Sequence, residues 1–470
     1  PSPFDEAIIL TLDGVGEWAT TTVAHGKGNK ITMLKEIHFP HSLGLLYSAF
    51  TYYAGFKVNS GEYKLMGLAP YGKSIYKKLI LKKLIDLKED GSFRLDMSYF
   101  NFATGLTMTN KKFDSLFGQP SRKSEKGMLT QFHMDIAASI QSVIEEIVLK
   151  ITKNIFTEYK IKNLCLAGGV ALNCVANGKI LKNKIFNKIW IQPAAGDAGG
   201  SLGAALGYWH HELDQKRRVN PNDSMNGSYL GPSFENSQIE HELRLMNVNF
   251  KKYKEDDLID ILANELSKEK TIGWFQGRME FGPRALGARS ILADPRSSNM
   301  QKELNLKVKF RESFRPFAPS VLSEEANNWF NLKDLSPYML MVAEIKKELQ
   351  IPMTREQENL FGINKLNIKR SKIPAVTHVD FSARIQTVHQ STNPKYYKLI
   401  KKFKEITGCP ILVNTSFNIR GEPIVGNIKD AVQCFMGTNL DILAIGDFIL
   451  LKSEQKKSLN KDYKNKFNLD

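Results

Sequence analysis

Apolar and polar residues alternate near the beginning of the chain, in three short runs that predict β-strands. These runs are Ala7–Leu12, Trp18–Ala24 and Ile31–Ile37, and a glycine-rich turn separates the first two. Consecutive strands joined by short turns are typical of an antiparallel meander. Two helices are expected after the meander, at His41–Tyr53 and Lys73–Leu87.

Helical periodicity is strongest in the next part of the chain. The longest predicted helix is Gln131–Thr157, where apolar residues recur at the spacing of one helix face. His133 and Asp135, near its beginning, are expected to have structural roles. Strands that alternate with helices are typical of a parallel sheet, so an α/β fold is predicted. The alternating elements are strands at Asn163–Leu166 and Lys188–Gln192, and helices from Asn173 and over Ala198–His211.

The chain then passes through a polar stretch into a second block of strands and helices. Asn, Asp, Ser, Gly and Pro cluster there and predict a linker at residues 221–240. The linker separates a first domain, 1–220, from a second, 241–452, and a polar tail follows at 453–470. Residues 346–372 predict a surface insertion. Around and within the second domain, the predicted helices are Glu235–Leu245, Asp256–Lys268, Ser297–Leu306, Lys395–Ile406 and Ile428–Met436, and the predicted strands are Thr271–Trp274, Phe317–Leu322, Tyr338–Ile345, Ser382–Val388, Pro410–Val413 and Ile442–Ile445.

Composition narrows the classes of function. The 470 residues contain 42% hydrophobic positions, enough for two buried cores, and no apolar run approaches the length of about 18 residues that spans a membrane. The four cysteines form no C-x-x-C pair, which favours free thiols and a cytoplasmic setting. A net charge of +16 admits phosphorylated ligands and nucleic acid. Lysine is spread over predicted helix faces, however, so a nucleic-acid partner is not expected.

Three strand ends in the first domain carry glycine beside an acid or an amide. They are Asp13-Gly14, Gly168-Gly169 followed by Asn173, and Asp197 among small residues. Glycine lets the backbone approach a ligand, and helix N-termini attract anions. Each motif also has a structural interpretation, as a hairpin turn, a tight packing turn or a helix cap. Because all three motifs follow strands of the same domain, together they favour a cleft that binds a nucleotide and a metal ion.

Arginine and lysine gather in the second domain, at residues 277–290 and 307–319, among apolar residues and prolines. A solvated helix face would instead place carboxylates four residues from such cations. Because the arginine fork matches phosphate oxygens, the two runs predict a pocket for a phosphorylated ligand. A third motif, 413–423, combines Ser416 and Asn418. It fits either a loop bonded to its own backbone or the same ligand site.

Seven segments resemble, in order along nearly the whole chain, the nodulation-protein and antibiotic O-carbamoyltransferase family. Matches in a common order are more specific than any single motif. The segments are residues 12–20, 62–72, 168–173, 196–201, 281–289, 310–319 and 414–423.

The resemblance implies an actin-like/sugar-kinase ATPase-type first domain and a carbamoyl-adenylate-forming α/β second domain. In such enzymes carbamoyl phosphate and ATP form carbamoyl adenylate in the second domain. The intermediate moves to the first domain, where a hydroxyl group of the acceptor attacks it and AMP leaves. The implied ligands are ATP with Mg²⁺, carbamoyl phosphate, a hydroxyl-bearing acceptor, and Fe²⁺ or Mn²⁺ in the first domain. A homodimer is compatible with the family.

Individual residues take their implied roles from the matched motifs. Asp13 and Asp197 match metal ligands, with Asp13 also catalytic, and Gly168, Gly169 and Asn173 match a nucleotide-binding turn. In the second domain Lys309 and Arg315 are the implied catalytic residues. The residues implied to bind carbamoyl phosphate are Arg284, Lys309, Arg311, Arg315, Arg384, Ser416 and Asn418.

One departure concerns a pair of histidines, four residues apart, that completes the metal site in the family. We expect this pair upstream of the segment with which the chain begins. The chain starts at Pro1 without a methionine, so we expect its first domain to lack the natural beginning and to bind metal poorly unless another chain supplies the histidines. The alternative functions are threonylcarbamoyl transfer to tRNA, a non-catalytic nucleotide-binding role, and nucleic-acid binding.

Overall fold

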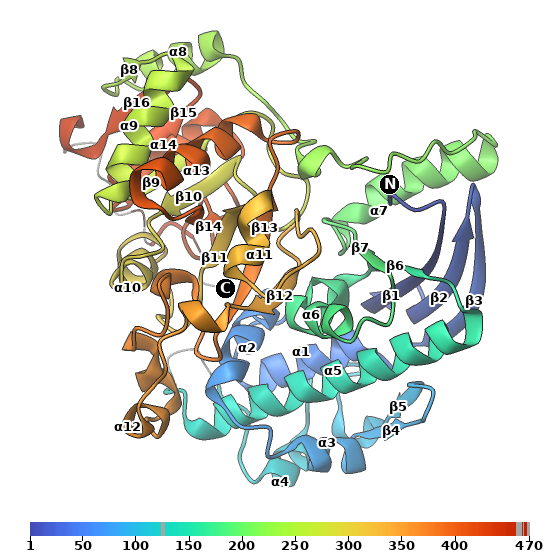
Figure 1. Cartoon of the computed structure of the whole chain (residues 1–470). Coiled ribbons are helices and arrows are strands. Elements are labelled where there is room, and N and C mark those ends of the chain that lie inside the picture. The colour runs from blue at the N-terminus through green and yellow to red at the C-terminus, as the bar shows by residue number, and fades with distance from the viewer. Residues whose placement is uncertain (124–126, 457–462, 464, 468–470) are drawn as a thin grey trace. The chain divides into compact units, whose positions relative to one another are not determined.

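The computed structural model describes residues 1–123, 127–456, 463 and 465–467. Its internal contacts divide the chain into unit 1, residues 1–224 with 361–364, and unit 2, residues 225–360 with 365–470. Both units combine helices and strands (Figure 1), which confirms the predicted α/β class.

Unit 1 is built on one five-stranded sheet, in the order β3-β2-β1-β6-β7. The predicted meander is confirmed, because β1 pairs antiparallel with β2, and β2 with β3. The predicted parallel sheet is also confirmed, because β1 pairs parallel with β6, and β6 with β7. Strand β1 therefore belongs to both halves of the sheet. The strands are β1 (Glu6–Gly16), β2 (Ala19–Lys27), β3 (Lys30–His38), β6 (Asn163–Ala167) and β7 (Lys188–Ile191).

The long helix α5 organises the helices of unit 1. Five apolar residues at helical spacing are fully buried on one face of α5, as their periodicity predicts: Ile136, Ile140, Val143, Ile144 and Ile147. Helices α1, α2, α3 and α6 all contact α5. The unit 1 helices are α1 (Leu43–Tyr53), α2 (Glu62–Leu68), α3 (Lys77–Lys83), α4 (Lys111–Phe117), α5 (Gln131–Tyr159), α6 (Cys174–Lys182) and α7 (Ala198–Gly207). Short 3-10 or π turns occupy Ala69–Tyr71, Met97–Tyr99, Gly169–Leu172 and Tyr208–Glu212.

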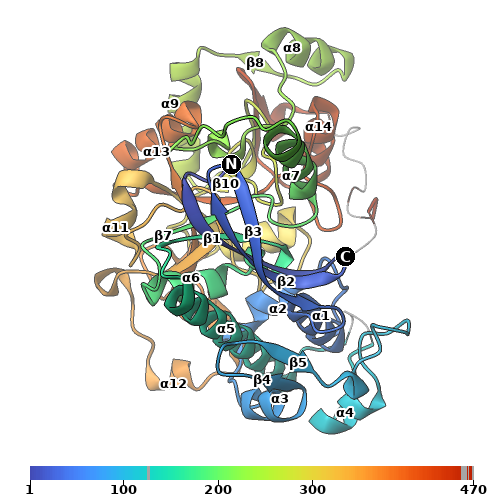
Figure 2. The ribbon, with the colours of Figure 1, turned by 90° about the vertical axis from the view of Figure 1, so that its right-hand side faces the viewer.

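One predicted helix of unit 1 is wrong over half of its length. The helix expected at Lys73–Leu87 ends at Lys83, and β4 (Ile85–Leu87) follows it and pairs with β5 (Phe93–Leu95). Figures 1 and 2 show this hairpin beside α5. The missed signal is Asp90-Gly91, a favoured turn pair, in which Gly91 has φ 87° and a Cβ would lie 2.5 Å from the backbone of α5.

His133 has the structural role predicted for it, at the beginning of α5. Its Nδ1 accepts a hydrogen bond from the backbone N–H of Thr130 at 3.2 Å, within a capping box. Burial, and then the charge of Arg122, lowers the pKa of His133 to about 4. The ring is therefore neutral in the folded protein.

Acidification should destabilise unit 1 through His133. Because the pKa is lower in the folded state, the stabilisation is complete above about pH 6.5 and declines as the pH falls toward 4. We expect a loss of at most about 2 kcal/mol, since the ring is partly screened by solvent. His133→Gln keeps an acceptor at this position and should remove that part of the pH dependence. Urea unfolding of the wild type and of His133→Gln, at about pH 6.5 and about pH 4, measures this loss of stability. An equal loss in the two proteins would contradict the role assigned to His133.

Unit 2 contains a nine-stranded mixed sheet, in the order β12-β13-β11-β14-β10-β9-β15-β16-β8. Three of its strands, β8, β10 and β16, were not predicted. Strand β10 was missed because it begins with Arg289, inside the arginine-rich run 277–290 that was interpreted as part of a ligand pocket. The strands are β8 (Lys251–Lys252), β9 (Ile272–Phe275), β10 (Arg289–Ala293), β11 (Ala318–Leu322), β12 (Met341–Glu344), β13 (Ser382–Val388), β14 (Ile411–Ser416), β15 (Ile442–Ile445) and β16 (Phe448–Leu451).

The helices of unit 2 agree with the predictions where periodicity is long and regular. Figure 1 shows α9 and α13, which contact each other along their length. The helix predicted at Ser297–Leu306 is confirmed in part: α10 begins at Met300, and a π-helical turn at Leu304–Val308 continues it. The helices are α8 (Asn236–Leu245), α9 (Glu255–Ser267), α10 (Met300–Glu303), α11 (Ala326–Trp329), α12 (Arg355–Glu358), α13 (Pro394–Thr407) and α14 (Ile428–Gly437). Short 3-10 turns occupy Asn226–Ser228, Ser323–Glu325, Lys347–Leu349, Gly362–Asn367, Pro374–Val376 and Lys452–Glu454.

Two further findings concern the predicted tail and the membrane. Within the stretch 453–470, Tyr463 is buried and lies against Gly437, so this residue is not part of a solvated tail. Among the helices of the described residues, none has the length and apolar character needed to cross a bilayer. The four cysteines are free and buried, as predicted for thiols that form no disulfide.

Candidate active site

Four neighbouring strands of unit 2 bring the predicted anion-binding residues to one end of its sheet. Strands β13, β11, β14 and β10 are adjacent in that order. Ser416 ends β14 and pairs with Ser290 near the start of β10. Arg284 and Arg315 lie in the segments that enter β10 and β11, and Arg384 is near the start of β13. Because β14 runs antiparallel to β10 and β11, its end lies beside their beginnings.

Lys309 has its ammonium group surrounded by oxygen atoms of the loop that follows β14. Its side chain is 3% exposed. Its Nζ lies 2.7 Å from the carbonyl oxygens of Ser416 and Asn418, and 2.6 Å from Asn418 Oδ1. The Ser416 hydroxyl donates to the same Oδ1 at 2.6 Å and lies 3.2 Å from Nζ. Two motifs that are 107 residues apart in sequence are thus one cluster.

Positive charge accumulates around this cluster. Burial lowers the pKa of Lys309 well below its ordinary value, and the charges of Arg311 and Arg315 contribute to the shift. Three acceptors within 2.7 Å match the three N–H donors of an ammonium group, so we assign the charged form to Lys309. An anion bound beside these guanidinium groups would favour that form further.

The loop around Asn418 is held by Glu422. Glu422 Oε2 accepts the backbone N–H of Ile419 at 2.8 Å, and Asn418 Nδ2 donates to the Glu422 carbonyl at 2.6 Å. The Tyr463 hydroxyl donates to Glu422 Oε1 at 2.5 Å. Burial raises the pKa of Glu422. Neither Glu422 nor Tyr463 was predicted, because a lone acid and a tyrosine in a polar stretch carry no pattern.

The loop that carries Arg284 is fixed by Glu280, another buried residue that sequence reasoning missed. Glu280 Oε1 accepts three backbone N–H groups, from Leu286 at 2.6 Å, Ala288 at 2.8 Å and Arg289 at 3.3 Å. From sequence, an acid within an arginine-rich run is expected to form ion pairs. In the structure its carboxylate instead determines the course of the backbone.

The prediction that residues 277–290 present their arginines to a ligand is wrong for Arg289. Its side chain is fully buried, and its guanidinium lies 3.7 Å from the ring centre of Phe275. Burial lowers the pKa of Arg289 to about 10. Its two terminal nitrogens donate to the carbonyl oxygens of Pro232, Gln276, Gly277 and Ala288. Arg289 therefore stabilises the sheet.

Unit 1 has its own candidate cleft, where β1 meets β6. Asp13 lines a cavity of about 240 Å³ together with Gly169 and Asn173. Asp13 Oδ1 accepts the backbone N–H of Gly14 at 2.8 Å and of Gly169 at 3.1 Å. Gly168 N–H donates to the carbonyl of Ala195. Both N–H groups of the predicted nucleotide turn are therefore used within the protein.

Asn173 has the capping role that the sequence left as one alternative. Its Oδ1 accepts the backbone N–H of Ala176 at 3.1 Å, and its amide exchanges hydrogen bonds with Gln141. It still lines the cavity. Gly168 has φ 89°, and a Cβ there would lie 2.2 Å from the Leu12 carbonyl, so the turn requires glycine for close packing of β6 on β1.

The described residues do not assemble a metal site. Asp197 is exposed at the beginning of α7 and does not line the cavity that contains Asp13. No group of three or more histidine, cysteine or acidic side chains suited to a metal ion occurs in the described part of the chain. Asp13 and Asp197 alone therefore do not fit the implied Fe²⁺ or Mn²⁺ centre, and we derive no reaction step from it.

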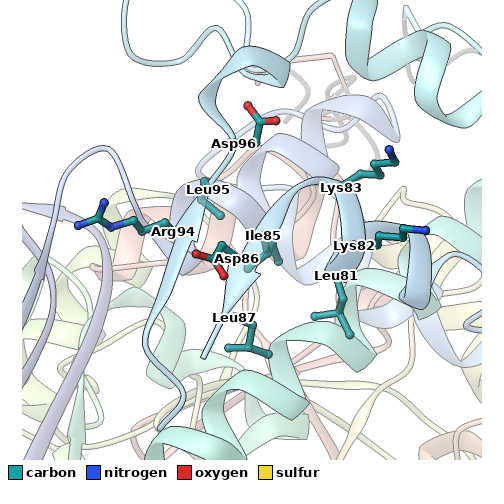
Figure 3. Close-up of a pocket in the computed structure, with 9 residues that line it drawn as sticks. All are labelled: Leu81, Lys82, Lys83, Ile85, Asp86, Leu87, Arg94, Leu95 and Asp96. Atoms are coloured by element: carbon teal, nitrogen blue, oxygen red, sulfur yellow. The ribbon is translucent and has the colours of Figure 1, made fainter. Parts of the chain in front are cut away.

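A second hollow in unit 1 contains none of the predicted site residues. It lies beside α3 and the β4–β5 hairpin, and Figure 3 shows its charged side chains, such as Lys82 and Arg94, extending in different directions. A phosphate site requires donors that converge, so this hollow is not the candidate site.

Comparison with known sequences identifies the two units. The carbamoyltransferase N-terminus family matches residues 1–206, and the carbamoyltransferase C-terminus family matches residues 263–452. The chain belongs to the carbamoyltransferase family. The predicted resemblance, and with it the prediction of a carbamoyltransferase enzyme, is confirmed.

Relatives of this carbamoyltransferase match almost all of its length. An uncharacterised protein of Synechocystis is 59% identical over 100% of the chain. Nodulation protein NolNO of Sinorhizobium fredii is 39% identical and nodulation protein NolO of Bradyrhizobium diazoefficiens 37% identical, each over 96% of the chain. The chain spans 77%, 62% and 76% of the length of these three relatives, respectively.

Proposed function

We propose that this carbamoyltransferase activates carbamoyl phosphate with ATP in unit 2 and transfers the carbamoyl group to a hydroxyl acceptor in unit 1. The observation that carries the proposal is the cluster of Lys309, Ser416 and Asn418 beside the charges of Arg311 and Arg315. Fixed cations at a strand end suit a small phosphorylated ligand. The carbamoyltransferase family models that match both units support the transfer of a carbamoyl group.

The first step proceeds to a carbamoyl adenylate. Water cleaves carbamoyl phosphate to carbamate and inorganic phosphate, and a carbamate oxygen attacks the α-phosphorus of ATP. A new P–O bond forms and pyrophosphate leaves. Arg284, Arg315 and Arg384 would bind the phosphate groups. Lys309 would hold the Ser416–Asn418 loop in place and stabilise the negative charge that develops on oxygen.

The second step transfers the carbamoyl group. The acceptor oxygen bonds to the carbamoyl carbon, the bond from that carbon to the AMP oxygen breaks, and the hydroxyl proton passes to solvent. AMP leaves the carbamoyl carbon more easily than hydroxide would leave free carbamate. Formation of the adenylate therefore divides one difficult step into two easier ones. For unit 1 we propose an actin-like ATPase-type fold. The mixed sheet supports this, because Asp13 and Gly169 line a cavity beyond the carboxyl ends of the parallel strands β1 and β6, the edge at which open α/β sheets bind ligands.

Pyrophosphate release tests the first step. The folded chain, incubated with ATP, Mg²⁺ and carbamoyl phosphate, should release pyrophosphate and inorganic phosphate in equal amounts, and release should require carbamoyl phosphate. Ser416→Ala should lower the rate about tenfold or more, because its hydroxyl orders Asn418 beside Lys309. Ser323→Ala, at a half-buried position in the turn after β11, is the matched control.

No pyrophosphate from the folded protein would exclude adenylate formation. Release that requires threonine and bicarbonate in place of carbamoyl phosphate, with a final product that forms only when tRNA is added, would favour the tRNA-modifying alternative.

A further inference from the structure

Three residues that follow β16 in sequence dock on helix α14 of unit 2. Gln433 and Gly437 are four residues apart in α14 and therefore share one face of the helix. Lys466 Nζ donates to Gln433 Oε1 at 2.9 Å, and the buried Tyr463 lies against Gly437. The ring of Phe467 packs edge-on against the Tyr463 ring, with 5.5 Å between the ring centres. The anchor residues Tyr463, Lys466 and Phe467 thus meet α14 along this one face.

Gly437 leaves the space that the Tyr463 side chain occupies. A Cβ at residue 437 would lie 2.2 Å from Tyr463 Cβ and 2.3 Å from its Cγ. Gly437 ends α14, and its backbone is not left-handed, so its conformation does not require glycine. Alanine also stabilises a helix more than glycine does. The absence of a side chain at residue 437 is therefore explained by the docking of Tyr463.

Tyr463 is joined to Lys309 by a series of direct hydrogen bonds. Its hydroxyl donates to Glu422 Oε1 at 2.5 Å, and Oε2 of the same carboxylate accepts the Ile419 N–H at 2.8 Å. Asn418 Nδ2 donates to the Glu422 carbonyl at 2.6 Å. Asn418 in turn supplies two of the oxygen atoms around Lys309 Nζ. A shift of the tyrosine would therefore reach the ammonium group through the loop.

The same series controls charge. Because both oxygens of Glu422 accept hydrogen bonds, we assign the carboxylate form to it. Burial raises the pKa of Glu422, and the hydrogen bond from Tyr463 opposes this rise most strongly. Burial, Arg311 and Arg315 lower the pKa of Lys309, and the charge of Glu422 raises it. Burial and Glu422 raise the pKa of Tyr463, so its hydroxyl stays a donor.

Among the described residues, three further titratable groups face this series. Cys434 of α14 faces Glu422, and burial raises the pKa of its thiol well above the ordinary value, so the thiol is neutral. Lys452 faces the same thiol, and Asp430 of α14 faces Tyr463. Of these groups only Cys434 bonds to the Glu422 carboxylate, as a weak donor. The Tyr463 hydroxyl is thus the strong side-chain donor to Glu422.

We propose that Tyr463 is a positioning residue for the Lys309 cluster: docked on α14, it fixes Glu422, and through Glu422 it holds Asn418 around Lys309. The effect on the reaction rests on the proposed function. The coupling of Tyr463 to the loop rests only on the contacts of Gly437, Tyr463 and Glu422.

Tyr463→Phe removes the hydroxyl and keeps the ring in place. In the full chain, the kcat of carbamoyl-phosphate-dependent pyrophosphate release should fall about tenfold. The KM for carbamoyl phosphate should change less than about twofold, because the arginines remain. The carboxylate loses a donor that favours its charged form, so the pKa of Glu422 rises. The acid limb of the kcat profile should therefore move to higher pH by about one unit.

Gly437→Ala tests the docking without removing a hydrogen-bonding group. The new methyl group excludes Tyr463, so the same loss of kcat and the same shift of the acid limb are expected. Gly203→Ala is its control, since a Cβ there meets no other described atom within 4 Å of the helix α7 position. Tyr397→Phe is the control for the tyrosine, because it removes a 2.5 Å bond to Glu324 at an exposed pair. Both controls should keep the wild-type kcat and acid limb.

Hydrogen exchange separates this proposal from a failure of the proposed function. The amide of Ile419, bonded to Glu422, should lose protection in Tyr463→Phe and in Gly437→Ala, whether or not the protein turns over. That loss in a protein that releases no pyrophosphate would support the coupling and remove only the adenylate step. Unchanged protection of amide 419 in both variants would overturn the proposal. So would a wild-type kcat and acid limb in both, or a fall in kcat without a shift of the acid limb in Tyr463→Phe.

Discussion

Replacement of Lys309 by methionine should lower carbamoyl-phosphate-dependent pyrophosphate release at least about 100-fold, because it removes a fixed positive charge and the bonds that hold the Ser416–Asn418 loop. Methionine fills a similar volume but donates no hydrogen bond. The carbonyl oxygens of Ser416 and Asn418 then lose their buried donor at 2.7 Å. The loop should therefore shift, and unit 2 should lose about 2–4 kcal/mol of stability.

Lys307→Met is the matched control for this variant. Lys307 lies two residues away, is 57% exposed and pairs with Glu303 at 3.0 Å along one helical turn. Such an exposed pair contributes about 0.5 kcal/mol or less, and activity should remain. If Lys309→Met unfolds, Asn418→Ala tests the same cluster from the other side, because it removes the side-chain bonds to Lys309, Ser416 and the Glu422 carbonyl and leaves the lysine in place. Wild-type release rates in both Lys309→Met and Asn418→Ala would refute the placement of the site.

The fold was predictable where the burial of one apolar helix face extends over a long segment. Gln131–Tyr159 and Pro394–Thr407 are amphipathic helices whose buried faces determine their period, so the sequence located both within two residues. Strand β10 was not found, although the equally buried strands β9, β11 and β15 were, because it starts at an arginine within a run of cations that resembled a binding loop. The β4–β5 hairpin depends on a two-residue turn rather than on periodicity.

The candidate site was predictable as a list of residue types but not as an arrangement. Local sequence indicated that Lys309 and Ser416 suit an anion, yet only the antiparallel register of β14 against β10 and β11 brings the two motifs together. Residues that support the site carry no local signal. Glu280 accepts three backbone N–H groups of the following loop, and Tyr463 donates one hydrogen bond to Glu422; such bonds have no period and no spacing rule.

Loss of the Glu280 carboxylate should lower the stability of unit 2 strongly. The reason is that this carboxylate holds the backbone of the loop that carries Arg284. Glu280→Ala leaves the N–H groups of Leu286, Ala288 and Arg289 without their acceptor in a buried region. It also removes a negative charge that favours the buried guanidinium of Arg289. An unsatisfied buried donor costs about 1–3 kcal/mol, so unit 2 should lose at least about 3 kcal/mol.

Hydrogen exchange gives a local measurement of this effect. Amides 286, 288 and 289 should lose protection in Glu280→Ala, and the KM for carbamoyl phosphate should rise because Arg284 is no longer held in place. Glu280→Gln retains an oxygen acceptor and should recover part of both properties. Glu240→Ala removes an exposed pair with Arg244 and should cost under about 1 kcal/mol. Unchanged protection at residues 286–289 in Glu280→Ala would mean that the loop is held by its other contacts, from Tyr229, Gln386 and Asn414, and not by this carboxylate.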